Sequence, residues 1–133
     1  LLRFFRQMIL LKKRKYTLHC KDFFCGEINK DGVPDISFSG CSINNPGWND
    51  PSSRVLSITF GAKTQDSDIH VMMNMDSQDL DFEIPKIVGK KWFRFSDTSL
   101  NSPDDICEIG QEKQVDGQNY NVKSRSVVIL ISK

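Results

Sequence analysis

The sequence lacks the patterns that usually announce an active site. Its eight glycines are scattered, and none belongs to a phosphate-binding loop ending in Lys-Ser/Thr. It contains no Gly-x-Ser-x-Gly nucleophile elbow and no His-Glu-x-x-His zinc helix. Most of its acidic residues fall in turns or on the outward side of predicted strands, where solvation explains them better than proton transfer. We therefore expect no catalytic residue, no metal and no cofactor in this chain.

The four cysteines are too dispersed for the common cysteine sites. They are Cys20, Cys25, Cys41 and Cys107, with only His19 and His70 to complete a ligand set. Structural zinc sites place their ligands a few residues apart in paired clusters, and no Cys-x-x-Cys pair occurs here. A chain of 133 residues also buries enough surface to fold without disulfides. We predict free, buried thiols in a reducing compartment.

Negative charge is absent from the start of the chain. No acid precedes Asp22, although this segment carries six of the 18 basic residues up to Lys15. A basic arm is one signature of RNA or acidic-lipid binding. The alternative is that the polar side of one helix is basic. We favour that alternative because the net charge is only +1, and we expect no nucleic-acid partner.

Long hydrophobic runs are also absent. No stretch approaches the roughly 20 apolar residues of a transmembrane helix, so we expect no membrane partner. The apolar start is broken by Arg3 and Arg6, and no small-residue cleavage site follows it, which argues against a signal peptide. The chain opens Leu-Leu-Arg in mid-pattern. We interpret this opening as a domain boundary within a longer protein.

Residues 1–15 have the periodicity of a helix. Their apolar positions follow the i, i+3, i+4, i+7 rule at Leu1, Phe4, Phe5, Met8 and Leu11, widened by Leu2 and Ile9. A stripe this broad requires a large partner surface. We expect the helix to be partly unpartnered, docking on the sheet or on a second copy of the chain, so a homo-oligomer stays open.

After Tyr16 the period changes to two, which indicates strands. The predicted strands are residues 35–38, 56–60, 69–75, 80–84, 92–95, 120–122 and 127–131. Turn signals separate them, and Asp116-Gly117 suits a tight hairpin because glycine accepts positive φ. The pattern predicts an all-β antiparallel sandwich preceded by one helix.

Trp48 is the candidate for ligand contact. It lies in a loop, Pro46-Gly47-Trp48-Asn49-Asp50-Pro51, without strand periodicity. An exposed indole there could stack on a sugar ring, and the alternative is that it plugs the end of the sandwich. Trp92 lies within a predicted strand and is expected in the core. His70 is expected to be a surface or packed residue.

Short motifs lie in a fixed order along nearly the whole chain. They are Phe4-Phe5-Arg6-Gln7-Met8-Ile9, Phe23-Phe24-Cys25-Gly26, Asp35-Ile36-Ser37-Phe38-Ser39-Gly40, Asn45-Pro46-Gly47-Trp48-Asn49-Asp50, Asp68-Ile69-His70-Val71-Met72-Met73-Asn74, Leu80-Asp81-Phe82-Glu83-Ile84-Pro85, Trp92-Phe93-Arg94, Asp97-Thr98-Ser99-Leu100, Ser102-Pro103-Asp104-Asp105-Ile106 and Arg125-Ser126-Val127-Val128. As an ordered set, they resemble the C-terminal domain of isoamylase-type glycogen- and starch-debranching enzymes, within the α-amylase superfamily.

The resemblance implies a Greek-key β-sandwich of the amylase C-terminal type over residues 19–133. Residues 1–18 would be the last helix of a catalytic barrel with its linker. The parent would be a glycoside hydrolase cutting α-1,6-glucosidic branches with acids upstream of Leu1, so none of the family's catalytic residues can be placed here. The implied partners are that barrel and, through the parent, an α-glucan, either glycogen or starch. The implied location is the cytoplasm, or the plastid of a plant or alga.

Two positions depart from the family pattern. Phe38-Ser39 stands where the family commonly has Trp-His, and Asp76-Ser77 stands where it often has an aromatic pair. Fewer flat apolar side chains weaken the case for direct sugar contact. The implied role is therefore to stabilise the barrel, with glucan binding or dimer contacts as additions. A freestanding carbohydrate-binding module and a protein-interaction sandwich with a basic arm stay open as alternatives.

Overall fold

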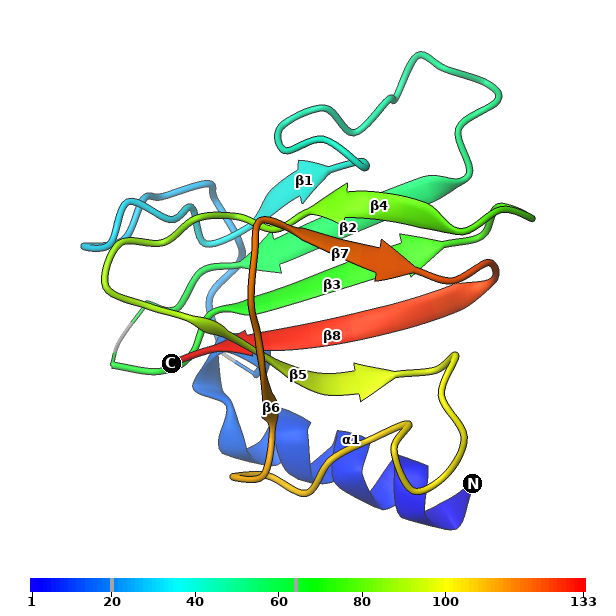
Figure 1. Cartoon of the computed structure of the whole chain (residues 1–133). Coiled ribbons are helices and arrows are strands. Elements are labelled where there is room, and N and C mark those ends of the chain that lie inside the picture. The colour runs from blue at the N-terminus through cyan, green and yellow to red at the C-terminus, as the bar shows by residue number, and fades with distance from the viewer. Residues whose placement is uncertain (20, 64) are drawn as a thin grey trace.

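The computed structural model describes residues 1–19, 21–63 and 65–133 (Figure 1). Helix α1 (Leu2–Arg14) and a 3₁₀ turn, η1 (Tyr16–Leu18), come first. The strands follow as β1 (Ser37–Ser39), β2 (Val55–Phe60), β3 (Ile69–Asn74), β4 (Leu80–Glu83), β5 (Trp92–Asp97), β6 (Lys113–Val115), β7 (Asn119–Val122) and β8 (Ser126–Ser132). The prediction of an all-β fold with one leading helix is confirmed.

The strands form two antiparallel sheets. The larger has six strands in the order β1-β2-β3-β8-β5-β6, and the smaller pairs β4 with β7. The pairing from β3 onward is nested: β5 pairs with β6, β4 with β7, and β3 with β8. Strand β8 also returns to lie beside β5, which is a Greek-key connection.

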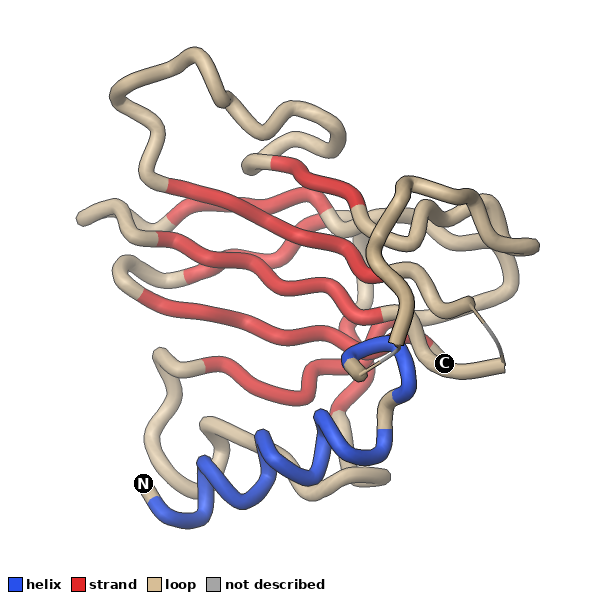
Figure 2. Tube along the Cα trace, turned by 180° about the vertical axis from the view of Figure 1, so that it is seen from behind, coloured by secondary structure: helices blue, strands red, loops and turns tan. Residues whose placement is uncertain are grey.

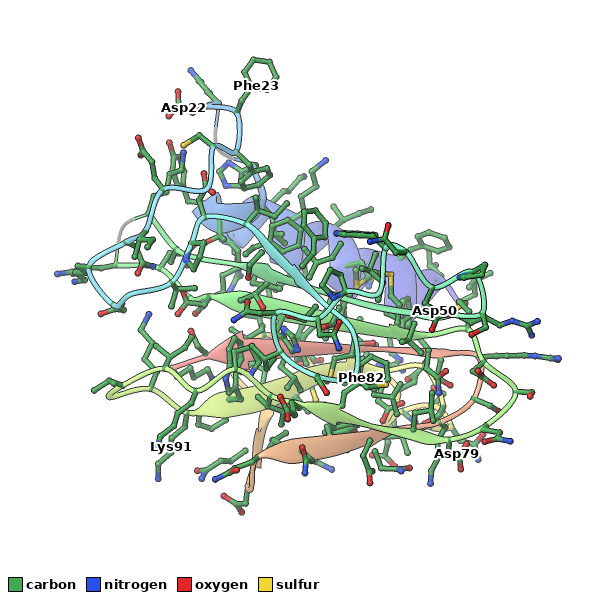
Figure 3. All side chains as sticks on the ribbon, turned by 90° about the horizontal axis from the view of Figure 1, so that it is seen from above. Asp22, Phe23, Asp50, Asp79, Phe82 and Lys91 are labelled. Atoms are coloured by element: carbon green, nitrogen blue, oxygen red, sulfur yellow. The ribbon has the colours of Figure 1, made fainter. Side chains whose placement is uncertain are left out.

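The core between the two sheets contains the apolar side of the β4 alternation, whereas in β2 the buried residues are Ser57 and Thr59, on the side predicted to be polar. Phe82 of β4 is fully buried and lies between the layers (Figure 3), where it packs with Met72, Val128 and Leu130. Its neighbours in sequence, Asp81 and Glu83, are exposed. The period-two pattern therefore packs the apolar side of β4 against the larger sheet and leaves its polar side exposed.

Helix α1 covers the other face of the larger sheet (Figure 2). Leu11, fully buried, packs with Ile69, Phe95 and Ile131, and Phe4 and Met8 pack against the same cluster. The helix ends with Lys12, Lys13 and Arg14 in its last turn, where positive charge favours the dipole. The expected docking on the sheet is therefore what the structure shows.

The Asp116-Gly117 hairpin prediction is wrong. Strand β6 pairs with β5 in the larger sheet, whereas β7 pairs with β4 in the smaller one. The turn therefore carries the chain between layers, with Gly117 at a φ of 92°. The short exposed strand β6, which lacks apolar alternation, was not predicted from the sequence.

The cysteine prediction holds only in part. Cys25, Cys41 and Cys107 are free, but Cys25 is exposed and the other two are half-buried. The thiol pKa of Cys41 is raised, first by burial and then by the negative charges of Asp76 and Asp81. Cys20 lies outside the described residues.

The inter-sheet packing predicts a large penalty for emptying its centre. We expect Phe82→Ala to lower the free energy of unfolding by about 3–5 kcal/mol, the usual cost of deleting a buried phenyl ring. Urea denaturation would measure the change. Phe23→Ala is the matched control, because Phe23 is 95% exposed and its loss should cost less than about 0.5 kcal/mol. Equal effects of the two substitutions would contradict this account of the core.

Candidate functional site

Trp48 lies on the surface and does not plug the sandwich. Its side chain is 66% exposed, in the loop between β1 and β2. The indole contacts Phe38 of β1 in an edge-to-face arrangement, with ring centroids 5.5 Å apart and an interplanar angle of 63°. The complementary quadrupoles of the two rings favour this edge-to-face arrangement. The result is an exposed aromatic pair at the edge of the larger sheet.

The backbone around Trp48 is shaped by close approaches and short hydrogen bonds. A Cβ on Gly40 would lie 2.6 Å from the carbonyl oxygen of Asn45, so only glycine fits there. The Asp50 N–H donates to the carbonyl oxygen of Gly47 at 3.0 Å. The Ser52 hydroxyl and N–H both donate to the Asp50 carboxylate, which lowers the pKa of Asp50. The loop therefore presents Trp48 from a defined turn.

Helix α1 has a second apolar face. Leu2, Phe5 and Ile9, spaced i, i+3, i+7, are 75%, 59% and 53% exposed. They point away from the side on which Leu11 is buried, since 100° per residue places the two groups on opposite sides of the helix. The single broad stripe predicted from the sequence is therefore divided, with one half docked on the sheet and the other exposed. We call Leu2, Phe5 and Ile9 the outer face of α1.

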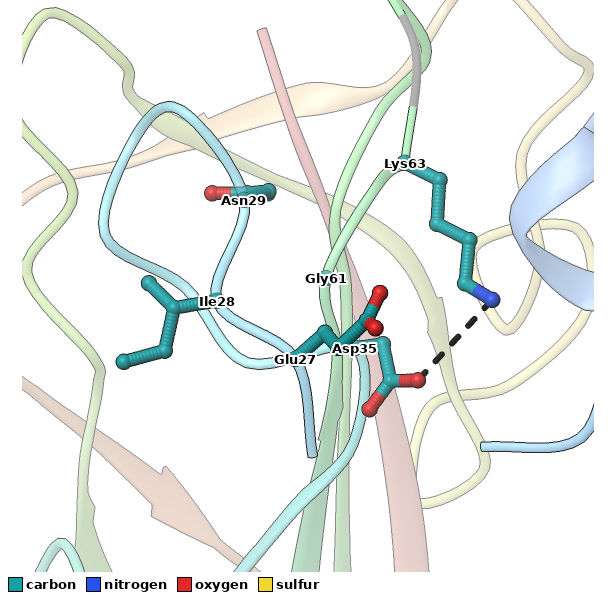
Figure 4. Close-up of a pocket in the computed structure, with 6 residues that line it drawn as sticks. All are labelled: Glu27, Ile28, Asn29, Asp35, Gly61 and Lys63. Carbon is teal, nitrogen blue, oxygen red and sulfur yellow. Dashed lines mark ion pairs between the residues drawn. The ribbon is translucent and has the colours of Figure 1, made fainter. Parts of the chain in front are cut away.

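A small hollow of about 190 Å³ lies beside the buried carboxylate of Asp35 (Figure 4). Burial alone would raise the pKa of Asp35, but N–H donors from Cys25 at 2.9 Å and Gly26 at 2.7 Å lower it. The ammonium of Lys63 lies 3.9 Å from the same carboxylate. Asp35 is therefore occupied in fixing the segment before β1, a role that sequence reasoning missed.

The acids of β4 and Asp79, which directly precedes it, also make structural hydrogen bonds. Asp79 accepts from the Ser124 N–H at 2.8 Å, and Asp81 accepts from the Asn121 amide at 2.9 Å. Glu83 accepts from the Ile43 N–H at 2.9 Å. Among residues 1–19, 21–63 and 65–133, no three His, Cys, Asp or Glu side chains cluster so as to hold a metal ion.

His70 is packed in the core. It is fully buried, its Nδ1 lies 2.9 Å from the hydroxyl of Thr59, and its ring centroid lies 5.8 Å from that of Trp92. Its Nε2 has no hydrogen-bond partner among residues 1–19, 21–63 and 65–133. Burial lowers the pKa of His70 to about 4, because a charged imidazolium would be poorly solvated there.

Comparison with known proteins supplies the family. A protein-family model described as "Isoamylase, C-terminal" matches residues 36–131 of the chain. The chain belongs to the isoamylase C-terminal domain family. The isoamylase domain is also 27% identical over 112 residues to "Isoamylase 2, chloroplastic" of Oryza sativa subsp. japonica, covering 76% of this chain. It spans only 14% of that relative's length.

The family match begins at Ile36 and ends at Ile131, so it covers the motifs from Ile36 onward but not those at residues 4–9 and 23–26. It therefore includes the Trp48 loop and all eight strands from Ser37 onward, the last through all but its final residue. Helix α1 lies outside the matched range. No helix within the described ranges is long and apolar enough to cross a bilayer.

The burial of His70 predicts a pH dependence of stability. Its pKa is about 4 in the folded chain and about 6.5 in the unfolded chain, so the unfolded chain binds more protons between these values. Stability should therefore fall by up to about 3 kcal/mol as the pH drops from 6.5 to 4.

Urea titrations at half-unit pH steps would measure this loss. His70→Leu should remove most of the slope in this window, because leucine does not titrate. An unchanged slope in the variant would show that other groups cause the loss.

Proposed function

We propose that this isoamylase domain is the non-catalytic C-terminal accessory domain of a debranching glycosidase that hydrolyses α-1,6-glucosidic branches of glycogen or starch. The family match supports it, as does the domain's 14% share of an isoamylase relative's length. The observation that carries the proposal is the outer face of α1, which is apolar and which the described part of the chain leaves exposed.

The partner of the outer face is the catalytic barrel of the same polypeptide. Leu2, Phe5 and Ile9 have the spacing with which one helix packs along another. Three large exposed apolar side chains in one stripe are typical of an interface. Docking on the barrel would bury both faces of α1, so the helix would join the sandwich to the catalytic domain.

The outer face gives a test in the complete polypeptide. Phe5→Glu with Ile9→Glu should leave the melting temperature of the 133-residue chain within about 2 °C, since both side chains are exposed. In the complete polypeptide the same pair should lower the melting temperature of the catalytic domain by at least about 4 °C. Val88→Glu is the control, because Val88 is 86% exposed and lies in the loop between β4 and β5 rather than on α1. An unaffected complete polypeptide would reject the docking.

Trp48 is the proposed glucan contact of the domain. Its exposed indole, held edge-to-face by Phe38, offers an apolar surface on which a pyranose ring can stack. The contact would be auxiliary, since it involves one exposed aromatic pair. The substrate-cleaving acids belong to the upstream barrel in this proposal.

Affinity electrophoresis in glycogen tests this contact. Trp48→Ala should weaken retardation of the isolated chain about fivefold, equivalent to about 1 kcal/mol, the size of one aromatic contact. Phe23→Ala removes an exposed aromatic elsewhere and should leave the mobility unchanged. Equal mobility of wild type and Trp48→Ala would remove Trp48 from the glucan-binding surface.

A freestanding carbohydrate-binding module is the second candidate, and the exposure of the Trp48–Phe38 pair favours it. That function predicts full glycogen affinity without any upstream domain. The accessory function predicts that affinity rises when the barrel is present. Release of linear chains from glycogen by the isolated chain would overturn the non-catalytic role itself.

Two further associations have direct tests. A second copy could cover the outer face of α1, and sedimentation equilibrium would then show a dimer that Phe5→Glu dissociates. A protein-interaction or RNA-binding role of the basic arm would appear as salt-dependent retention on heparin. If the chain is monomeric and is not retained on heparin, the barrel remains the proposed partner of the outer face of α1.

A further inference from the structure

The larger sheet is only partly covered on the side of α1. The apolar cluster beneath the helix takes its sheet residues from β3, β8 and β5, and it reaches β2 only at Phe60. Figure 2 shows α1 along one border of this side, whereas no described helix crosses β1 or β2. An apolar sheet face requires a covering layer. The side chains of the uncovered strands therefore decide what this side of the sheet can bind.

The uncovered part of the sheet is apolar. Phe38 of β1 pairs with Ile58 of β2, and Ile58 pairs with Val71 of β3. Leu56 pairs with Met73, and each lies two residues along its strand from that pair. Paired residues share a face, and Val71 packs against the cluster under α1, so all of them face the side of α1. Phe38 is 38% exposed and the others are half-buried. We call Phe38, Leu56, Ile58 and Met73 the open face.

One flank of α1 borders the open face. The guanidinium of Arg3 donates to the Ile106 carbonyl oxygen at 2.9 Å and pairs with Asp105, so Arg3 points to the β5–β6 loop. At about 100° per residue, Phe5 lies about 200° and Met8 about 140° around the helix from Arg3. These two side chains therefore lie on the other flank, toward β2 and β3. The open face is thus continuous with the outer face of α1, to which Phe5 also belongs.

The open face has the width of one helix. From β1 through β2 to β3 there are two strand spacings of about 4.8 Å each, which amount to roughly 10 Å. An α-helix with its side chains is about 10 Å across. A second helix laid beside α1 would cover β1 and β2 and would contact α1 at Phe5 and Met8. The sheet and the flank of α1 together therefore form a corner that is suited to a helix.

The charges that border the open face are positive. Lys12 lies about 180° around α1 from Arg3, on the flank of the open face, and Arg54 directly precedes β2. Both side chains are exposed, and neither pairs with an acid among residues 1–19, 21–63 and 65–133. An isologous contact contains the same surface twice, so a second copy would add cations and another α1, which contains no acid. An occupant with acidic residues along its border is therefore favoured over a second copy.

We propose that an apolar helix of the polypeptide preceding α1 packs on the open face, side by side with α1. It completes a helical layer over the larger sheet. Its apolar stripe, with i, i+3, i+4, i+7 spacing, faces the sheet, and its acidic residues lie toward Lys12 and Arg54.

The upstream polypeptide can supply such a helix. The chain spans only 14% of the length of its isoamylase relative, so a polypeptide of that kind has ample length for it. Residues that lead into α1 arrive on this side of the sheet, because α1 itself lies there (Figure 2). The inference rests on the proposed function, which provides the upstream polypeptide, and it adds a second contact surface to the outer face of α1.

Oxidation of Met73 by hydrogen peroxide, measured by mass spectrometry, tests whether the open face is covered. Met73 should react in the 133-residue chain, where it is half-buried at an open surface. In the complete polypeptide its oxidation should slow at least about fivefold, because methionine oxidation follows exposure. Val88→Met is the matched control, since position 88 is 86% exposed in the β4–β5 loop and should react equally in both. Met72 is fully buried and should stay unreactive in both.

Photo-cross-linking identifies the occupant. A diazirine analogue of methionine in place of Met73 is irradiated in the complete polypeptide. It should link to one segment upstream of Leu1, at positions three or four residues apart, as one face of a helix presents them. The same analogue in place of Val88 should give no link to that segment.

Three results would overturn the inference. They are an unchanged oxidation rate of Met73 in the complete polypeptide, cross-links from position 73 to a second copy of the chain, and cross-links at alternate residues, which would show a strand. Docking of the outer face is judged separately, by the melting of the complete polypeptide with Phe5→Glu and Ile9→Glu. If that melting temperature falls while Met73 stays reactive, the accessory role stands and the helix on the open face is rejected.

Discussion

Burial of strand β8 on both faces is the constraint on which the rest of the domain depends. Its run Val127-Val128-Ile129-Leu130-Ile131 turns alternate side chains to opposite sides of the larger sheet, and both sets are apolar. Val128 and Leu130 join the core under β4 and β7, whereas Ile129 and Ile131 join the core under α1. A strand of this kind requires two covering layers, and the chain supplies a different one on each side.

One end of the larger sheet is fixed by a buried carboxylate. There, Asp68 accepts from the Ala62 N–H and from the hydroxyl of Ser132, each at 2.8 Å, and pairs with Lys90. These contacts join the start of β3, the end of β8 and the loop before β5. A buried charge with several donors is stable where an unpaired one is not. Substituting one of the donors to Asp68 should therefore destabilise the domain by more than the loss of one ordinary hydrogen bond would.

The sequence predicted the features that depend on local burial and missed those that depend on distant partners. Strands β2, β3 and β4 were located because their sequences alternate with a period of two, but in β2 the alternation indicates the wrong buried face, since Ser57 and Thr59 are buried and Leu56 and Ile58 are only half-buried. The Asp116-Gly117 turn was misassigned because the strands on its two sides choose partners in different sheets. The hydrogen bond of Asp68 to Ser132 joins residues 64 positions apart, and no local pattern announces it.

The candidate sites show the same contrast between features that a local sequence pattern predicts and features that depend on distant parts of the chain. Exposure of Trp48 was one of two readings of an aperiodic loop, and its contact with Phe38 needed the fold. The division of the α1 stripe into docked and exposed halves follows from the position of the sheet, which periodicity alone does not contain. The hollow between two loops, residues 84–91 and 116–118, exists only because the strands on either side of them lie in nested pairs.

The position of β8 has a consequence for how the domain is made. It follows every other strand in the chain, yet it lies at the centre of the larger sheet, between β3 and β5. During synthesis, β1–β3 and β5–β6 therefore emerge as two separate groups of strands, with no hydrogen bonds between them. The sheet closes only when β8 leaves the ribosome, and pairing of this long range is slow. Until that moment the nascent domain exposes two unpaired strand edges and depends on its cellular surroundings to stay unaggregated.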